Sequence, residues 1–139
     1  MSRLFLSILI PASVMITSGC TNPLSDLFGT PTTSNPTTDT FNGSLAPSGA
    51  LVFTFSVATA GNVAVTLTAV SPAPTAPLGL GVGPSSNGTC TITNATSGAT
   101  AGGSPQLSAT ENPGTYCVKV TDAGGLLTTS SVTVTVSHT

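Results

Sequence analysis

Apolar residues recur at every second position along much of the chain from Phe41 to the C-terminus, and this period constrains the fold most strongly. The clearest runs cover residues 51–57, 63–69, 78–82, 116–120 and 132–136, with shorter candidates at residues 41–45, 89–93 and 106–109. Such alternation places one face of a strand in a core and the other in water. Turn residues separate the runs. We therefore expect an all-β, jelly-roll-like antiparallel β-sandwich of about seven or eight short strands.

Charge is scarce in this sequence. Charged residues make up 4% of the 139 residues, against about 25% in an ordinary soluble domain, and the formal net charge is −2. A chain of this length has room for one domain. Because no cluster of Lys and Arg is present, the sequence argues against nucleic acid as a partner.

The N-terminus has the parts of an export signal. Arg3 precedes an apolar run at residues 4–16, which is shorter than the roughly 20 residues that span a bilayer. Thr17-Ser18-Gly19-Cys20 follows, and the whole segment resembles a bacterial lipoprotein signal with its lipobox, although Thr17 stands where Leu is usual. An ordinary secretory signal with an accidental cysteine is the alternative.

The resemblance implies a signal peptide at residues 1–19, cleavage before Cys20 and a diacylglyceryl group on the Cys20 thiol. The partner expected from it is the membrane, and the location is the cell envelope. In lipoproteins an Asp after the cysteine often retains the protein in the inner membrane. Thr21 occupies that place, so the expectation is the outer membrane where the cell has one.

Residues 20–40 are rich in Thr and Pro and show no apolar period. Pro removes backbone donors and favours extended chain, so we expect a tether between the lipid and a domain at residues 41–139. Leu24, Leu27 and Phe28 are the apolar exceptions, and the alternative is that they enter lipid or dock on the domain.

Three cysteines are present, and lipidation of Cys20 leaves Cys90 and Cys117 as a pair. Exported chains meet oxidising conditions, so we expect a disulfide. Alternation puts Cys117 on the same face as Lys119, opposite Tyr116, Val118 and Val120, which places the bridge on the outer face or at a sheet edge. Use of the pair as metal ligands lacks partners, because His138 is the only histidine.

Several short motifs resemble the bacterial pre-peptidase C-terminal domain family. They are Phe41-x-Gly43-x-Leu45, Phe53-x-Phe55-x-Val57, Gly61-Asn62-Val63, the segment Asn112-Pro113-Gly114-Thr115-Tyr116 with its following strand, and the final Val-Thr-Val-Thr-Val. The match covers most of residues 40–139. It implies a jelly-roll-like β-sandwich of the kind attached to secreted peptidases, some of which bind polymeric substrates. This chain departs from the pattern in having no preceding peptidase and few aromatic residues.

The residues needed for catalysis are too few. His138 lies beside the C-terminus, and we expect it to be a tail residue. Asp39 lies at the tether boundary, while Glu111 and Asp122 flank one strand from opposite ends; we expect solvated turn residues, with weak Ca²⁺ contacts as the alternative. The Gly-rich residues 79–83 lack the Lys and helix of a phosphate-binding loop. The sequence predicts no enzyme, cofactor or metal site.

Two functions remain open. The first is a surface-anchored, non-catalytic lipoprotein that presents a binding or accessory module for an extracellular protein or polysaccharide. It predicts a patch of apolar or aromatic side chains on one outer face. The alternative is a structural or self-associating envelope protein, which predicts smooth Thr and Ser faces and an open sheet edge with few charges. The Thr-x-Thr pairs at residues 66/68, 89/91 and 133/135 fit exposed strand faces.

Lipidation can be tested by metabolic labelling with a fatty-acid analogue. The protein should carry the label, and Cys20→Ser should abolish it because the acceptor thiol is gone. Equal labelling of the Cys20→Ser variant would contradict the assignment.

Overall fold

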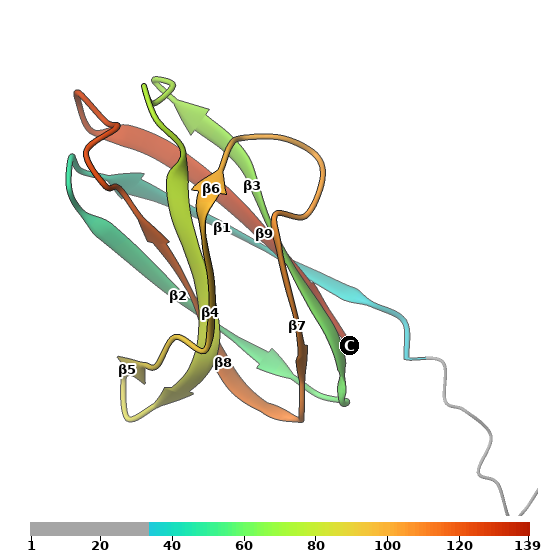
Figure 1. Ribbon diagram of the computed structural model, residues 1–139. Helices are drawn as coiled ribbons and strands as arrows, with labels where there is room; N and C mark the ends of the chain where they lie inside the picture. Colours follow the sequence, from blue (N-terminus) through green and yellow to red (C-terminus); the bar gives the residue numbers. More distant parts are fainter. Residues whose placement is uncertain (1–33) are drawn as a thin grey trace, which may run out of the picture. The chain divides into compact units, whose positions relative to one another are not determined.

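Nine antiparallel strands make up most of residues 34–139, the part of the chain that the computed structural model describes (Figure 1). They are β1 (Thr37–Leu45), β2 (Ala50–Val57), β3 (Gly61–Ser71), β4 (Leu78–Ser86), β5 (Thr89–Cys90), β6 (Asn94–Ala99), β7 (Leu107–Glu111), β8 (Gly114–Thr121) and β9 (Ser130–His138). Within these residues no helix is long and apolar enough to cross a membrane.

The strands form two sheets. The four-stranded sheet has the order β1-β9-β3-β7, and the five-stranded sheet has the order β2-β8-β4-β5, with β6 also paired to β4. Most connections cross from one sheet to the other, so most neighbouring strands within a sheet are remote in the sequence, the exceptions being β5 and β6 beside β4. The expected antiparallel sandwich is confirmed, with nine strands rather than seven or eight.

The core lies between the two sheets and is built from the alternate residues that the sequence indicates. Its most buried members are Leu45, Leu67, Leu78, Leu80, Val63, Val65, Val82, Val118, Val120, Val132, Val134 and Val136. Full burial of such a side chain contributes about 1.5–3 kcal/mol. Since Val and Leu supply nearly all of this layer, it needs few aromatic residues.

The strand boundaries differ from the expectation in two places. Strand β1 begins at Thr37, so residues 37–40, expected in the tether, pair with the end of β9. Strand β6 was not expected at all. Its residues are small and mostly polar, and only Ala99 is buried. The segment therefore lacks the alternation of apolar and polar residues from which a strand is predicted. It is held by pairing with β4.

The expectation that His138 is a tail residue is wrong. It is the last residue of β9 and keeps the inward phase of the valines before it, so its side chain is buried. Its Nε2 lies 3.0 Å from Asp39 Oδ2 on β1, and its ring centroid lies 5.4 Å from that of Phe55. The period of two simply continues to the end of the strand.

Asp122 is also not the solvated turn residue that was expected. Its side chain is buried and accepts hydrogen bonds from the backbone N–H groups of Ser48 (2.8 Å), Gly125 (2.8 Å) and Leu126 (3.2 Å). The bond from Ser48, aided by those from the residues after Asp122, lowers the pKa of this carboxyl below its ordinary value. Asp122 thus ties the β1–β2 turn to the loop after β8.

Acid should weaken the fold through Asp122. Because its pKa is lower in the folded than in the unfolded chain, the ionised carboxylate stabilises the fold above the unfolded pKa. This contribution is lost as pH falls through the folded pKa. We expect Asp122→Asn to lower the melting temperature at neutral pH and to flatten its decline on acidification, measured by circular dichroism. Glu111→Gln is the control, and an unchanged acid profile in Asp122→Asn would contradict the assignment.

Candidate functional site

The outer face of β4 has no side chains along its middle. Gly79, Gly81 and Gly83 alternate there with the inward-facing Leu78, Leu80 and Val82. This absence lets the segment after β5 approach the sheet closely. A Cβ on Gly83 would overlap the carbonyl oxygen of Thr91, and one on Gly81 would lie 2.9 Å from Cγ2 of Ile92. Gly83 is therefore required by the backbone that lies over it, whereas Gly81 leaves room for the side chain of Ile92.

The disulfide holds that overlying segment in place. Cys90 and Cys117 are bonded, with their Cα atoms 5.8 Å apart, as the sequence predicts. Cys117 points outward from β8, yet its side chain is fully buried, because the segment that follows Cys90 covers it. Two backbone hydrogen bonds, from the Thr91 N–H to the Pro84 carbonyl and from the Thr93 N–H to the Val82 carbonyl, both 3.0 Å, also hold this segment against β4.

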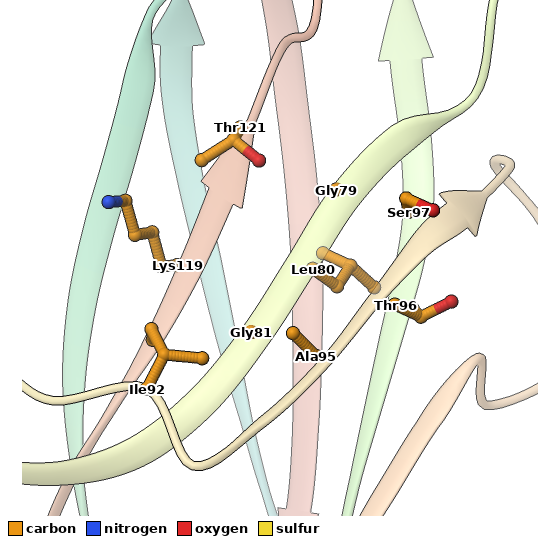
Figure 2. A pocket seen from close by; sticks show the side chains of 9 residues that line it. All are labelled: Gly79, Leu80, Gly81, Ile92, Ala95, Thr96, Ser97, Lys119 and Thr121. Carbon is orange, nitrogen blue, oxygen red and sulfur yellow. The ribbon is translucent and has the colours of Figure 1, made fainter.

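A groove of about 470 Å³ lies beside this attachment, over the glycines of β4 (Figure 2). It is lined by Gly79, Leu80, Gly81, Ile92, Ala95, Thr96, Ser97, Lys119 and Thr121. Figure 2 shows Lys119 and Thr121 on β8 at one side of β4, with Ala95, Thr96 and Ser97 on the other. The volume falls within the usual range for small-ligand sites. Its walls combine hydroxyl groups, the apolar residues Leu80, Ile92 and Ala95, and one cation.

Lys119 gives the groove its charge. It is the only lysine or arginine in the described part of the chain, and it lies in register with Val52 on β2 and Gly81 on β4. Within residues 34–139 the ion pair found is His138 with Asp39, so no carboxylate there lies within ion-pair distance of Lys119. Lys119 is half-buried as a residue, and its ammonium group is available to an anion that enters the groove.

The two outer faces of the sandwich differ. On the four-stranded sheet, Thr40, Thr135 and Thr66 lie side by side on neighbouring strands. Thr66 is buried, contrary to the expectation of an exposed face there, and the exposed positions of β1 and β9 are Thr, Ser or Asn. The five-stranded sheet instead exposes Val52 (49%) and Ile92 (36%) near Lys119. Features expected for a binding module and for a smooth structural face thus occur on opposite sides of one domain.

A second cavity of about 340 Å³ lies at the loop between β3 and β4. It is lined by Val70, Ala73, Pro74, Thr75, Ala76, Pro77, Thr100 and Ala101. No ionisable side chain contributes to it, and of its two threonine hydroxyls that of Thr75 already donates to the Gly125 carbonyl at 2.8 Å. The groove over β4 therefore offers a ligand more polar groups and a charged group.

The candidate catalytic residues are not assembled into one site. Asp39 and His138 pair on β1 and β9, Glu111 ends β7, and Asp122 follows β8. Within residues 34–139 no three His, Cys, Asp or Glu side chains gather as a metal site. Cys20, Leu24, Leu27 and Phe28 lie outside the described residues.

The groove itself was missed by sequence reasoning. Alternate glycines in a strand are its one sequence signal, because such glycines often mark close approach of another backbone. Neither the comparison with protein-family models nor the comparison with curated proteins finds a match for this chain.

Removing the disulfide should destabilise the domain. In a Cys20→Ser background, Cys90→Ser with Cys117→Ser should lower the free energy of unfolding by about 3.5 kcal/mol, because the unfolded chain regains the entropy of the closed loop. Urea denaturation measures this, and reduction of the parent protein should give the same shift. Equal stability of the oxidised parent and the double variant would contradict a stabilising bridge.

Proposed function

We propose that this protein is a lipid-anchored, non-catalytic envelope lipoprotein whose sandwich domain binds an acidic polysaccharide outside the cell. The groove over β4 is the proposed binding site. The observation that carries the proposal is the position of Lys119, a cation without an acidic partner among the described residues, at the wall of an open groove.

Support for the lipid anchor comes from the cysteines. The N-terminal segment from Arg3 to Cys20 has the order of a lipoprotein signal. The other two cysteines are bonded to each other in the domain, which leaves the Cys20 thiol as the acceptor for a diacylglyceryl group. Acyl chains added there would hold the domain at the membrane surface, and two or more give stable anchoring.

Support for a module of the pre-peptidase C-terminal type comes from the fold and from where the shared motifs lie. The sandwich architecture is the one that this resemblance implies. The Phe53-x-Phe55 motif lies in β2, and Tyr116 lies in the neighbouring strand β8. The Tyr116 hydroxyl donates to the Asn112 carbonyl at 2.9 Å, which gives that residue a structural role at the start of β8.

The lining of the groove favours an acidic sugar polymer over a neutral one. Neutral sugars are commonly held by stacking on exposed aromatic rings, and none lines this groove. Hydroxyls of Thr96, Ser97 and Thr121 can exchange hydrogen bonds with sugar hydroxyls, and Lys119 can pair with a carboxylate. The groove lies on an open sheet face (Figure 2), where an extended chain can pass across it.

A role in binding rather than catalysis is supported by the state of the one histidine. His138 is buried, its Nε2 contacts Asp39, and no hydroxyl of the described residues hydrogen-bonds to its ring. A nucleophile activated by this imidazole would need such a contact. The carboxylates Glu111 and Asp122 lie at opposite ends of the β8 region.

Isothermal titration calorimetry of the mature chain, made soluble by Cys20→Ser, tests the proposal. The probe is polygalacturonate, and its methyl-esterified form is the uncharged control. We expect binding to polygalacturonate that weakens with salt, and a loss of about tenfold in Lys119→Gln because a charge-assisted contact is removed. Lys119→Arg keeps the charge and should retain most of the affinity.

Three outcomes would contradict the proposal. The first is equal affinity for the charged and the esterified polymer. The second is equal affinity in Lys119→Gln. The third is stronger binding to polyglutamate than to polygalacturonate, which would indicate an acidic peptide as the ligand. The length of the polymer after incubation should be unchanged if the domain is non-catalytic.

A further inference from the structure

Strand β2 forms one edge of the five-stranded sheet. Its partner within the described residues is β8, and its other side carries no strand (Figure 1). An unpaired strand edge presents backbone N–H and C=O groups that can bind another strand.

The hydrogen bonding at the start of β2 shows which groups are free. The backbone N–H of Asp122 donates to the Gly49 carbonyl at 3.0 Å, just before the first ladder pair, Ala50 with Thr121. Hydrogen-bonded pairs alternate along an antiparallel ladder, so Leu51, Phe53, Phe55 and Val57 bond to β8. The backbone groups of Ala50, Val52, Thr54 and Ser56 therefore point away from the sheet, and all four of these residues are exposed.

Strand β2 also lacks the residues that usually protect an edge. Its sequence, ALVFTFSV, contains no charge, proline or glycine over eight residues. The other edge strands are shorter or are interrupted: β1 contains Asp39 and Gly43, β5 has two residues, β6 contains Gly98 and β7 ends at Glu111. Long, uncharged edge strands rich in β-formers are those that pair with another chain.

The inner side of the same edge is apolar and incompletely covered. Leu51 and Phe53 are only partly buried against the core. The ring of Phe53 stacks on that of Phe41 from β1, with centroids 5.1 Å apart. A strand added beside β2 would cover these side chains as well as the free backbone groups.

We propose that two copies of this protein pair through β2, antiparallel and about a two-fold axis at Phe53. In this register Val52 faces Thr54 of the second copy, and Ala50 faces Ser56. Each residue of one copy whose backbone N–H and C=O groups point away from β8 then faces such a residue of the other copy. Each of these pairs forms two hydrogen bonds, which gives about eight in all. The two Phe53 rings meet on the inner side.

A second copy fits this edge because the edge is self-complementary. One β2 edge offers the same run of donors and acceptors as the other, as a closed two-fold interface requires. The strand is uncharged, so no like charges on β2 are opposed. The nearest cation, Lys119, lies one strand further in, on β8. The inference does not depend on what the groove over β4 binds.

The first experiment is sedimentation velocity of the mature Cys20→Ser chain over a range of concentrations. We expect a reversible dimer. Thr54→Lys introduces a charge at the centre of the interface, and Thr54→Pro removes an outward N–H without breaking the β2–β8 ladder. Both should weaken the dimer by about tenfold or more. Ser131→Lys adds the same charge to an exposed position of β9, in the other sheet, and should leave the dimer unchanged.

A second experiment tests the register. Facing residues in a hydrogen-bonded antiparallel pair have Cα atoms about 5.5 Å apart, which suits a disulfide. Mixing Val52→Cys protein with Thr54→Cys protein should therefore give cross-linked heterodimers under mild oxidation, several-fold more than either variant alone.

The proposal is overturned in any of three cases. The parent chain could remain monomeric up to millimolar concentration. The dimer could persist undiminished in both Thr54 variants while they remain folded by circular dichroism, which would place the interface on another surface. Cross-linking could be no greater in the mixture than in the separate variants, which would exclude the register.

Discussion

The apolar layer between the two sheets is the interaction on which the rest of the structure depends. Val134 and Val136 from β9 and Val118 and Val120 from β8 lie in the middle strands of opposite sheets and are fully buried. Because most strands that are neighbours in a sheet are remote in sequence, neither sheet can be completed without the other. The inner faces carry nearly all of the large side chains, which leaves the outer faces free to differ.

The outer face of β4 is unusual for a strand because glycines occupy its alternate positions. Glycine in a strand normally weakens it, because it adds backbone entropy to the unfolded chain and supplies no side chain to pack. Here Gly83 lets a backbone segment lie on the sheet, Gly81 makes room for the Ile92 side chain, and the Cys90–Cys117 bond ties that segment to β8. The missing side chains of Gly79 and Gly81 leave the floor of the groove open, so attachment and cavity both follow from the alternate glycines of β4.

Three of the few ionisable groups in the domain have a defined structural contact. Asp122 holds two loops through backbone N–H groups, and Asp39 pairs with the buried His138. Within residues 34–139, buried polar side-chain atoms all have hydrogen-bond partners. Lys119 is the charged group left without an acidic partner there. Lack of charge also leaves β2 as an edge without electrostatic protection.

The sequence alone determined the class of fold, because a period of two can bury only one face of each strand. It also predicted most of the strand positions and the pairing of Cys90 with Cys117. It did not reveal β6, whose small polar residues carry no alternation, nor the extension of β1 to Thr37, which depends on pairing with β9. The sequence-based expectation for Asp122 and His138 was wrong, because isolated polar residues near turns and termini are usually exposed to solvent. The contacts that hold these two side chains in the interior come from Ser48 and Asp39, which are distant in the sequence. The groove and the open edge were likewise decided by tertiary structure, since each depends on which strands become neighbours, and long-range pairing is not encoded in any local pattern.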